Sequence, residues 1–319
     1  MKVLDFKTIK KMYGNEFNSG DCYVWVETAL KEKTSFDMPA KSRINQEDGD
    51  YYAIMPCMYK DFAMVKMIGR HDIKEGESRP AMMSDLMLYE AKSGIIKGLM
   101  DGELITTLRT GAAAAHSALM FAKSDFDTVA IIGLGNIMTV CMDVFLDKIK
   151  GRPIKLKVYK HHDQEKRIFE RYKHYENVEF IFCDTYDETM ANSDVIFSAV
   201  TRVQENFCKD KCYKPGCTVI PIMTMGFQNC DLFFDQVFTD EIEQIRGFKY
   251  FDKFKSLTNI SDVLNGKAKG RNNDEERIMI YNYGLAIHDL FYAIKLYELA
   301  DKKGLDIEYN YCQSKFFMD

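Results

Sequence analysis

The chain has 319 residues, of which 46% are hydrophobic and 29% are charged, and its formal net charge is -5. This composition is typical of a globular protein, and it excludes both a disordered chain and the strongly basic surface that nucleic-acid binding needs. No apolar run is long enough to cross a bilayer, and the amino terminus lacks the apolar core of a signal peptide, so we expect a cytoplasmic protein without a membrane partner.

The first part of the chain predicts a helix followed by strands. Strand-like runs are YYAIMPCMY, FAMVKMIGR and SDLMLYE, and the turn residues 91–94 predict a hairpin with IIKGLMDG as the returning strand. The alanine-rich run that follows predicts a helix with Thr110 as its N-cap, so that Arg109 stands immediately before the helix start.

From Thr128 onward, strand-like and helical runs alternate. Helical segments extend to about Lys150 and over residues 162–174, and the strand-like runs are VAIIG, KLKVY, VEFIF, DVIFSAV, TVIPIM and QVFTD. Strands that alternate with helices predict an α/β fold with a doubly wound parallel sheet of the Rossmann type. Residues 278–304 have apolar residues at helical spacing and predict a final helix.

The nine cysteines are scattered along the chain, which favours reduced, mostly buried thiols in a cytosolic protein. Cys208, Cys212 and Cys217 form a cluster, but their spacing is not that of a zinc knuckle and no histidine lies nearby. We therefore predict no metal site.

The run VAIIGLGNIM contains the first half of a dinucleotide-binding fingerprint. Gly133 and Gly135 end a predicted strand and open a predicted helix, which is the context that the fingerprint requires. The first glycine forms the tight turn, and the second lets the backbone at the helix start, which includes Asn136 and Ile137, approach a pyrophosphate. Met138 stands where a third small residue would serve helix–strand packing. A lone GxG also occurs in ordinary turns, but the βαβ pattern favours a nucleotide site.

The end of the second predicted strand bears on the choice of cofactor. An acidic residue there would hold the free ribose of NAD, whereas this chain has Lys160 followed by His161 and His162. A cation suits a 2′-phosphate, so we expect NADP rather than NAD. Asp163 lies close enough in sequence to reach the ribose instead, and Lys160 as a solvated lysine is the other alternative.

Three basic residues of the first domain are candidates for binding an anion. Alternation in FAMVKMIGR places Lys66 on the same face as Met64 and Ile68, where a lysine needs a partner or a ligand. Arg109 beside a helix start would favour a carboxylate or a phosphate. Arg43, in the run PAKSRIN, is ambiguous on its own, and an exposed salt bridge is the alternative for each residue.

Several runs of the chain form a pattern that is shared with a known family: DGELITTLRTGAAAAHSA, the GLG turn and GLAIHDLFYAIKLYELADKKGL, with support from SRIN, IMPCM, FAMVKMIG and DVLNGKAKGR. Through these runs the chain resembles the ornithine cyclodeaminase/mu-crystallin family over almost its whole length. It implies a homodimer in which a discontinuous substrate-binding and dimerisation domain, residues 1–115 completed by 285–319, accompanies a Rossmann domain over residues 116–284. It also implies that Arg43 and Arg109 hold a substrate carboxylate, that Lys66 touches this carboxylate and assists proton movement, and that Thr110 and Thr201 lie at the cofactor.

The sequence departs from the family pattern near the substrate. Val200 stands where the family often has a threonine, although Thr201 is adjacent. In MTMGFQNCDLFFD, the position of the aspartate that handles the amine is occupied by Gln228, and Asp231 is the nearest carboxylate. An amide can orient a substrate but cannot accept its proton, which argues against ornithine cyclodeamination.

The sequence therefore predicts an NAD(P)-dependent oxidoreductase that exchanges hydride with the α-carbon of a small α-amino or α-imino acid. Gln228, Asp231 and Lys66 are the candidate catalytic residues. Two alternatives stay open. One is a cyclodeaminase that recycles its NAD within one turnover, and the other is a dinucleotide-binding protein without catalytic activity.

Overall fold

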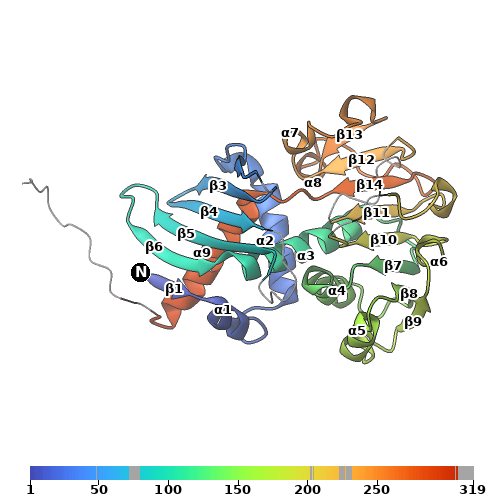
Figure 1. The fold of residues 1–319 in the computed structure, drawn as a ribbon, viewed down its shortest axis with the longest axis horizontal. Coiled ribbons are helices and arrows are strands. Elements are labelled where there is room, and N and C mark those ends of the chain that lie inside the picture. The colour runs from blue at the N-terminus through green and yellow to red at the C-terminus, as the bar shows by residue number, and fades with distance from the viewer. Residues whose placement is uncertain are drawn as a thin grey trace, which may run out of the picture. The chain divides into compact units, whose positions relative to one another are not determined.

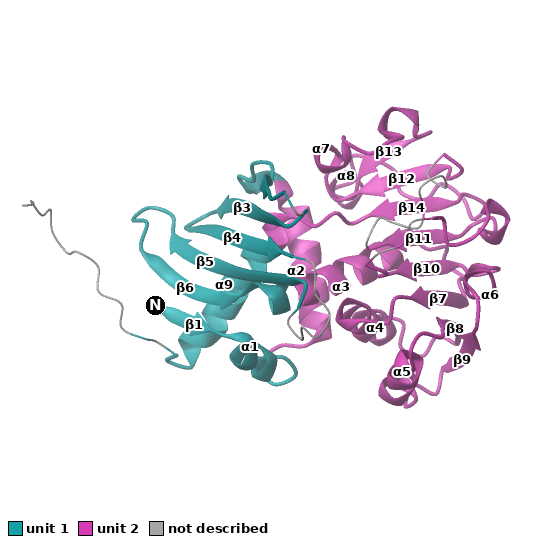
Figure 2. Cartoon of the chain, viewed as in Figure 1, with its two compact units in different colours: residues 1–16, 34–105, 289–319 teal, residues 17–33, 106–288 magenta. Residues whose placement is uncertain are grey.

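The computed structural model describes residues 1–47, 49–71, 80–201, 203, 205–222, 227, 232–305 and 307. The chain divides into two compact units (Figure 2), and each is described by itself. Unit 1 consists of residues 1–16, 34–105 and 289–319, and unit 2 consists of residues 17–33 and 106–288. The limits predicted from the sequence, after residues 115 and 284, differ from these, and they stay a prediction because compact units need not be independently folding domains.

Unit 1 is built on a six-stranded mixed sheet with the order β1-β6-β5-β4-β3-β2. β1 runs parallel to β6 and the other neighbours are antiparallel. The strands are β1 (Lys2–Leu4), β2 (Ser42–Asn45), β3 (Tyr51–Tyr59), β4 (Phe62–Arg70), β5 (Met82–Glu90) and β6 (Ile96–Asp101). The four longer strands and the hairpin between β5 and β6 are confirmed. β1 and β2 are too short for an alternating pattern to reveal them.

One face of this sheet packs against α9 (Ala286–Lys302), which runs behind the strands in Figure 1. Three contacts mark its course in unit 1: Asp289 pairs with Lys66 of β4, Tyr297 packs edge-on against Phe62, and Asp301 pairs with the buried Lys2 of β1. Unit 1 also contains α1 (Phe6–Met12), and residues 34–35 of the short η1 (Lys33–Ser35) lie in it.

Unit 2 contains an eight-stranded, wholly parallel sheet with the order β13-β12-β14-β11-β10-β7-β8-β9 (Figure 1). Its strands are β7 (Thr128–Ile132), β8 (Ile154–Tyr159), β9 (Val178–Cys183), β10 (Val195–Ser198), β11 (Thr218–Pro221), β12 (Gln236–Thr239), β13 (Leu257–Asn259) and β14 (Ile278–Tyr281). The order reverses between β7 and β10, so this is a doubly wound sheet and the predicted fold class is confirmed.

The helices of unit 2 precede, connect and follow these strands. They are α2 (Ser19–Lys31), α3 (Gly102–Phe121), α4 (Asn136–Lys148), α5 (Gln164–Tyr172), α6 (Tyr186–Met190), α7 (Ile242–Ile245) and α8 (Ile260–Leu264), with short turns η2 (Asp210–Cys212) and η3 (Phe251–Lys253). α3 begins in unit 1 and continues into unit 2. No helix among the described residues is both long and apolar enough to cross a membrane.

Two predicted boundaries are wrong. The helix predicted from Thr110 begins eight residues earlier, because the side chain of Asp101 accepts a hydrogen bond from the backbone N–H of Leu104 at 2.7 Å and caps the helix there. The helix predicted over residues 278–304 begins only at Ala286. Residues 278–281 form the buried strand β14, and Gly284, at φ +92°, turns the chain before the helix.

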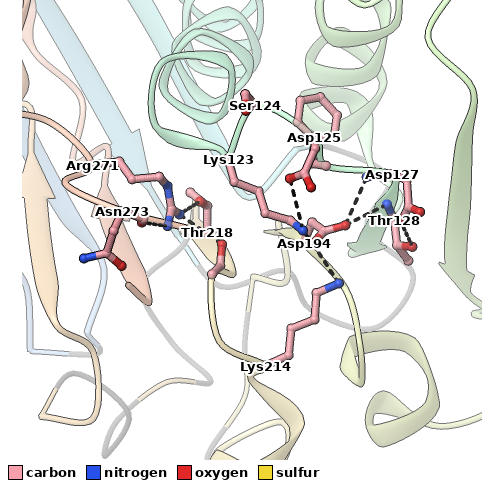
Figure 3. A network of polar contacts seen from close by, with 12 residues as sticks. Lys123, Ser124, Asp125, Asp127, Thr128, Asp194, Lys214, Thr218, Arg271 and Asn273 are labelled. Carbon is pink, nitrogen blue, oxygen red and sulfur yellow. Dashed lines mark hydrogen bonds and ion pairs between the residues drawn. The ribbon is translucent and has the colours of Figure 1, made fainter. Parts of the chain in front are cut away.

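The amino ends of the unit 2 strands are fixed by the buried carboxylate of Asp194 (Figure 3). One of its oxygens accepts hydrogen bonds from the backbone N–H groups of Asp127 and Thr128 at 3.0 and 3.1 Å, and the other pairs with Lys123 and Lys214 at 3.1 and 2.7 Å. The carboxylate therefore ties the start of β7 to the start of β10. This leaves the opposite, carboxyl edge of the sheet for ligands.

Cys208, Cys212 and Cys217 lie in the hydrophobic core of unit 2, together with Val219 and Phe234. The described cysteines are free thiols and all of them are buried. Burial raises the pKa of Cys217 to about 12, which keeps this thiol protonated and unreactive. The prediction of reduced, buried thiols is confirmed for these positions.

Candidate dinucleotide and substrate sites

The GLG turn joins β7 to α4 at the point where the strand order reverses. Gly133 has φ +79°, and a Cβ at this position would lie 2.5 Å from the carbonyl carbon of Ala199 and 2.6 Å from the nitrogen of Val200. The turn therefore packs directly on the chain that leaves β10. Only glycine provides both the backbone conformation and the close approach.

Gly135 has a different reason to be glycine. It is the N-cap of α4 in an extended conformation, and a Cβ there would meet no described atom within 4 Å. Gly135 and Asn136 are exposed, Ile137 is half-buried, and glycine has no side chain to cap the first turn. The N–H groups at the start of α4 are thus placed to bind an anion.

A shallow cavity of about 400 Å³ adjoins this helix start. It is lined by residues of the turn and of the segment that follows β8: Gly135, Asn136, His162, Asp163, Gln164 and Arg167. Its lining combines backbone donors, a guanidinium and an imidazole with one carboxylate. This donor set fits the phosphate and ribose groups of a dinucleotide.

The residues after β8 divide between this cavity and other partners. Lys160 forms an ion pair with Asp184 at 2.6 Å and is absent from the lining, while the N–H of His161 donates to the carboxylate of Glu165 at 3.0 Å. Asp163 lines the cavity and pairs with Lys166 at 2.9 Å. Arg167 also lines it, and its guanidinium donates to the carbonyl of Leu134 in the GLG turn.

Met138 and Gly111 explain how α4 packs without a third small residue in the fingerprint. The Met138 side chain is fully buried beneath the turn. Where α4 meets α3, the small residue comes from α3: a Cβ at Gly111 would lie 2.7 Å from the nitrogen of Cys141 and 2.8 Å from the carbonyl oxygen of Ile137. The close helix contact is thus made by Gly111 of the RTGAAAA run.

The other predicted cofactor residues lie in unit 2 but outside the described cavity. Thr110 is in the middle of α3 and almost buried, so it caps no helix. Thr201 is exposed in the bend after β10, and Val200 packs against the hydrophobic core.

Arg109 also lies within α3, so the argument that placed it beside a free helix start is wrong. It is 7% exposed, and its guanidinium lies against Gly284, since a Cβ at Gly284 would be 2.6 Å from Nη1. The residue is held by the loop before α9 and not by a helix end.

Lys66 lies on the inner face of the unit 1 sheet, as predicted. Its side chain is fully buried between β3 and β5, and Nζ is 2.8 Å from Oδ1 of Asp289, which is also fully buried. Burial, together with the charge of Asp289, raises the pKa of the neighbouring Cys57 thiol to about 12. The site is therefore a buried ammonium–carboxylate pair.

Arg43 lies on the exposed edge strand β2 of unit 1, where its guanidinium stacks on the ring of Tyr51 at 3.8 Å. Arg43 and Lys66 thus belong to one sheet, and Arg109 belongs to unit 2. Gln228 and Asp231 lie outside the residues that the structure describes.

The sequence interpretation missed Asp289 and Arg167. Asp289 is the acidic residue in the apolar run GLAIHDLFYAI, so the need of Lys66 for a partner was the signal that would have found it. Arg167 is one of several charged residues on α5, and nothing in the local pattern distinguishes it.

Comparison with known proteins identifies this combination of a Rossmann sheet and a second, mixed sheet. The Ornithine cyclodeaminase/mu-crystallin family matches residues 3–304. The chain belongs to this family. Among its relatives is alanine dehydrogenase of Archaeoglobus fulgidus, 23% identical over 282 residues, which cover 84% of this chain and 86% of the relative.

Two solved structures share the fold of this family member. One is an archaeal alanine dehydrogenase dimer with bound NAD, with a TM-score of 0.85, 19% identity, and coverage of 98% of this chain and 99% of the other. The second is the Δ1-pyrroline-2-carboxylate reductase of Thermococcus litoralis in complex with NADH and L-proline, with a TM-score of 0.81, 20% identity, and coverage of 97% and 100%. The predicted family and fold class are confirmed.

Proposed function

We propose that the protein is an NAD(P)-dependent oxidoreductase that acts on a small α-amino or α-imino acid. The observation that carries the proposal is the exposed start of α4 behind the GLG turn, at the switch point of the sheet, in a chain of this family. The alanine dehydrogenase and pyrroline-carboxylate reductase relatives support it, because both names describe redox chemistry at the α-carbon. When bound, the nicotinamide would exchange the hydride.

We propose that Arg43 and Arg109 bind the substrate carboxylate and that Lys66 polarises it and relays a proton. Two forked guanidinium groups orient a planar carboxylate, and orientation is what hydride transfer needs. The Lys66–Asp289 pair supports the role of Lys66, because a buried ammonium beside a carboxylate has both a proton and an acceptor for it. Arg43→Ala and Arg109→Ala should each raise KM for the carboxylate substrate.

Gln228 and Asp231 stay as candidates for the group that handles the substrate amine. We expect Gln228→Asp to raise amino-acid oxidation or cyclodeamination, because it introduces a carboxylate that can accept a proton. If that variant gains nothing while Asp231→Asn abolishes the native activity, Asp231 is the acid–base residue.

We propose that NADP binds more tightly than NAD. The sequence assigned this preference to Lys160, but Lys160 pairs with Asp184, whereas Arg167 and His162 line the cavity beside the turn. The cation for the 2′-phosphate is therefore Arg167, with His162 as a second donor.

Titrating both cofactors tests this assignment. Arg167→Ala should weaken NADP about tenfold to a hundredfold and NAD much less, since a hydrogen bond to a charged group contributes about 1.5–3 kcal/mol. Lys160→Asp, which would reverse the preference if Lys160 were the contact, should change little. An NAD preference in the wild type would contradict the proposal and point to Asp163 as a ribose ligand.

The reaction itself is tested with a panel of small amino, keto and cyclic imino acids, in which cofactor absorbance and ammonia are followed together. Net oxidation or reduction of the cofactor supports the proposed oxidoreductase. Ammonia release without a net change in the cofactor indicates a cyclodeaminase. Cofactor binding without turnover of any compound indicates a binding protein. A cytoplasmic location and a homodimer complete the proposal.

A further inference from the structure

Gly284 lies in direct contact with the guanidinium of Arg109. A Cβ at this position would be 2.6 Å from Nη1, 3.1 Å from Nη2 and 3.3 Å from Cζ, so the planar group of Arg109 lies on the space that any other residue would fill. Gly284 also has φ +92°, which L side chains rarely adopt. The turn over residues 282–285 is thus shaped to receive this arginine.

The turn is held from its other side by the carboxylate of Asp240. Asp240 follows β12 directly and is 1% exposed, and its Oδ2 accepts a hydrogen bond from the backbone N–H of Gly284 at 2.8 Å. Burial raises the pKa of Asp240, while hydrogen bonds from the N–H groups of Gly284 and Tyr283 and the charges of Lys33 and Arg109 act in the opposite direction. Asp240 is thus electrostatically coupled to Arg109.

A further contact anchors Asp240 itself. The ammonium of Lys33 donates to the backbone carbonyl of Asp240 at 2.7 Å and pairs with the side chain of Glu241 at 2.8 Å. The backbone of Asp240 is therefore fixed by Lys33, the first residue of η1. Of its side-chain oxygens, Oδ1 accepts from the hydroxyl of Thr239 at 3.4 Å and Oδ2 accepts from the turn.

We propose that Asp240 is a positioning residue, which holds the Tyr283–Gly284 turn so that the guanidinium of Arg109 is presented in one orientation. All these groups lie in unit 2. The consequence for substrate affinity rests on the proposed function, in which Arg109 binds the substrate carboxylate. Asp240 touches neither substrate nor cofactor in this proposal and acts only through the turn.

Two pairs of variants separate this role from a general loss of stability. Gly284→Ala introduces a Cβ against Arg109, and Gly266→Ala is its control, because Gly266 also has a positive φ of +69° but its Cβ would meet no described atom within 4 Å. Asp240→Asn removes the charge at the end of β12, and its control is Asp235→Asn before the same strand, where a carboxylate accepts the N–H of Arg277 at 3.0 Å.

The first measurement needs no substrate. The rate at which phenylglyoxal modifies Arg109 in the folded protein is followed by peptide mass spectrometry, and the fold of each variant is checked by circular dichroism. We expect several-fold faster modification in Gly284→Ala and Asp240→Asn than in the wild type and in both controls. Unchanged rates in folded Asp240→Asn, the milder variant, overturn the proposal, as would equal increases in the controls.

The second measurement connects the position of Arg109 to binding. With a substrate identified from the panel, Asp240→Asn and Gly284→Ala should raise KM about tenfold or more, with a smaller fall in kcat and an unchanged Kd for the dinucleotide. Faster modification of Arg109 without any effect on KM would leave the positioning role intact and disprove the proposed role of Arg109. A parallel loss of dinucleotide affinity would indicate a structural role only and contradict the proposal.

Discussion

The two glycines of the GLG turn differ in what surrounds them, and substitutions should separate their roles. Gly135→Val places its side chain in open space at the start of α4, so the protein should stay folded while dinucleotide binding is lost. Gly133→Ala should instead destabilise the fold by several kcal/mol, about the cost of severe overpacking with backbone strain, because its Cβ would overlap the backbone of Ala199.

Thermal unfolding and cofactor titration of both variants check this prediction. Unchanged cofactor affinity in a folded Gly135→Val protein would show that the phosphate site lies elsewhere.

His116 makes the stability of unit 2 depend on pH. It is almost completely buried in α3 beside the ring of Tyr23, and burial lowers its pKa from 6.5 to about 4, with Lys31 acting in the same direction and Glu27 against it. As the pH falls, the imidazole of His116 therefore becomes protonated near pH 6.5 in the unfolded chain but only near pH 4 in the folded protein. Stability is lost as the pH falls through this window, by about 2 kcal/mol between pH 7 and pH 5.

Urea unfolding of the wild type and His116→Leu at several pH values tests this expectation. The variant should lose much less stability between pH 7 and pH 5 than the wild type. Equal slopes for wild type and His116→Leu would refute the assignment.

At the scale of elements, the start of α3 offers a direct test of the observed helix boundary. Asp101→Ala removes the carboxylate that accepts the N–H of Leu104, and it should cost about 1 kcal/mol, or a few degrees in Tm. Thr110→Ala, at the start that the sequence predicted, should show no such loss, because alanine is the better helix former within α3. The reverse order of the two effects in thermal unfolding would contradict the boundary.

The Lys66–Asp289 pair joins β4 to α9 inside unit 1, and both side chains are fully buried. Removing one partner takes the ion pair away from a fully buried charge, so Lys66→Met and Asp289→Leu should each lower the free energy of unfolding by about 3–5 kcal/mol. The double variant should recover most of this loss, which a double-mutant cycle in urea measures. Additive losses would show that the two charges do not stabilise each other.

The elements that could be predicted from the sequence are those whose own residues show a clear spacing of apolar and polar side chains. β3 to β6 and the βαβ run alternate or form buried runs over enough residues to be recognised, and the GLG turn marks the start of α4. The apolar run IMIY of β14 fits the spacing of a helix as well as that of a strand, so the sequence predicts a helix there. Only its pairing between β11 and β12 in the folded sheet shows that it is a strand. The Lys66–Asp289 pair could be predicted only in part: a lysine on an apolar face needs a partner, but no local pattern connects it to a residue 223 positions away.

For the whole molecule, the outer face of the unit 1 sheet predicts how two copies associate. This face, opposite Lys66, exposes apolar side chains on neighbouring strands, and the registers align Val3 with Leu99 and Leu99 with Met87. The exposed apolar members of the face are Val3, Ile44, Tyr52, Met58, Met67, Met83, Met87 and Leu99. Asp85, paired in register with Met67, is an exposed charge on this face, but the number of exposed apolar side chains around it is typical of an interface.

We expect a dimer at micromolar concentration by light scattering, and a monomer for the double variant Met67→Lys/Met87→Lys, because two buried lysines would oppose association. Val24→Lys, at an equally exposed apolar residue of α2, should leave the dimer intact. A monomeric wild type, or a double variant that still dimerises, would contradict an interface on this face.

The contact of Gly111 with α4 has a consequence for how the enzyme family can diversify. Arg109 stands two residues before Gly111 on α3, and Gly135 caps the helix that Gly111 touches, so the proposed anchor for the substrate and the proposed anchor for the cofactor lie on two helices in close contact. The packing of α3 on α4 therefore sets the distance between the two proposed anchors. A change of substrate length must then be absorbed by residues outside α3 and α4, and these two helices are poor places for specificity engineering.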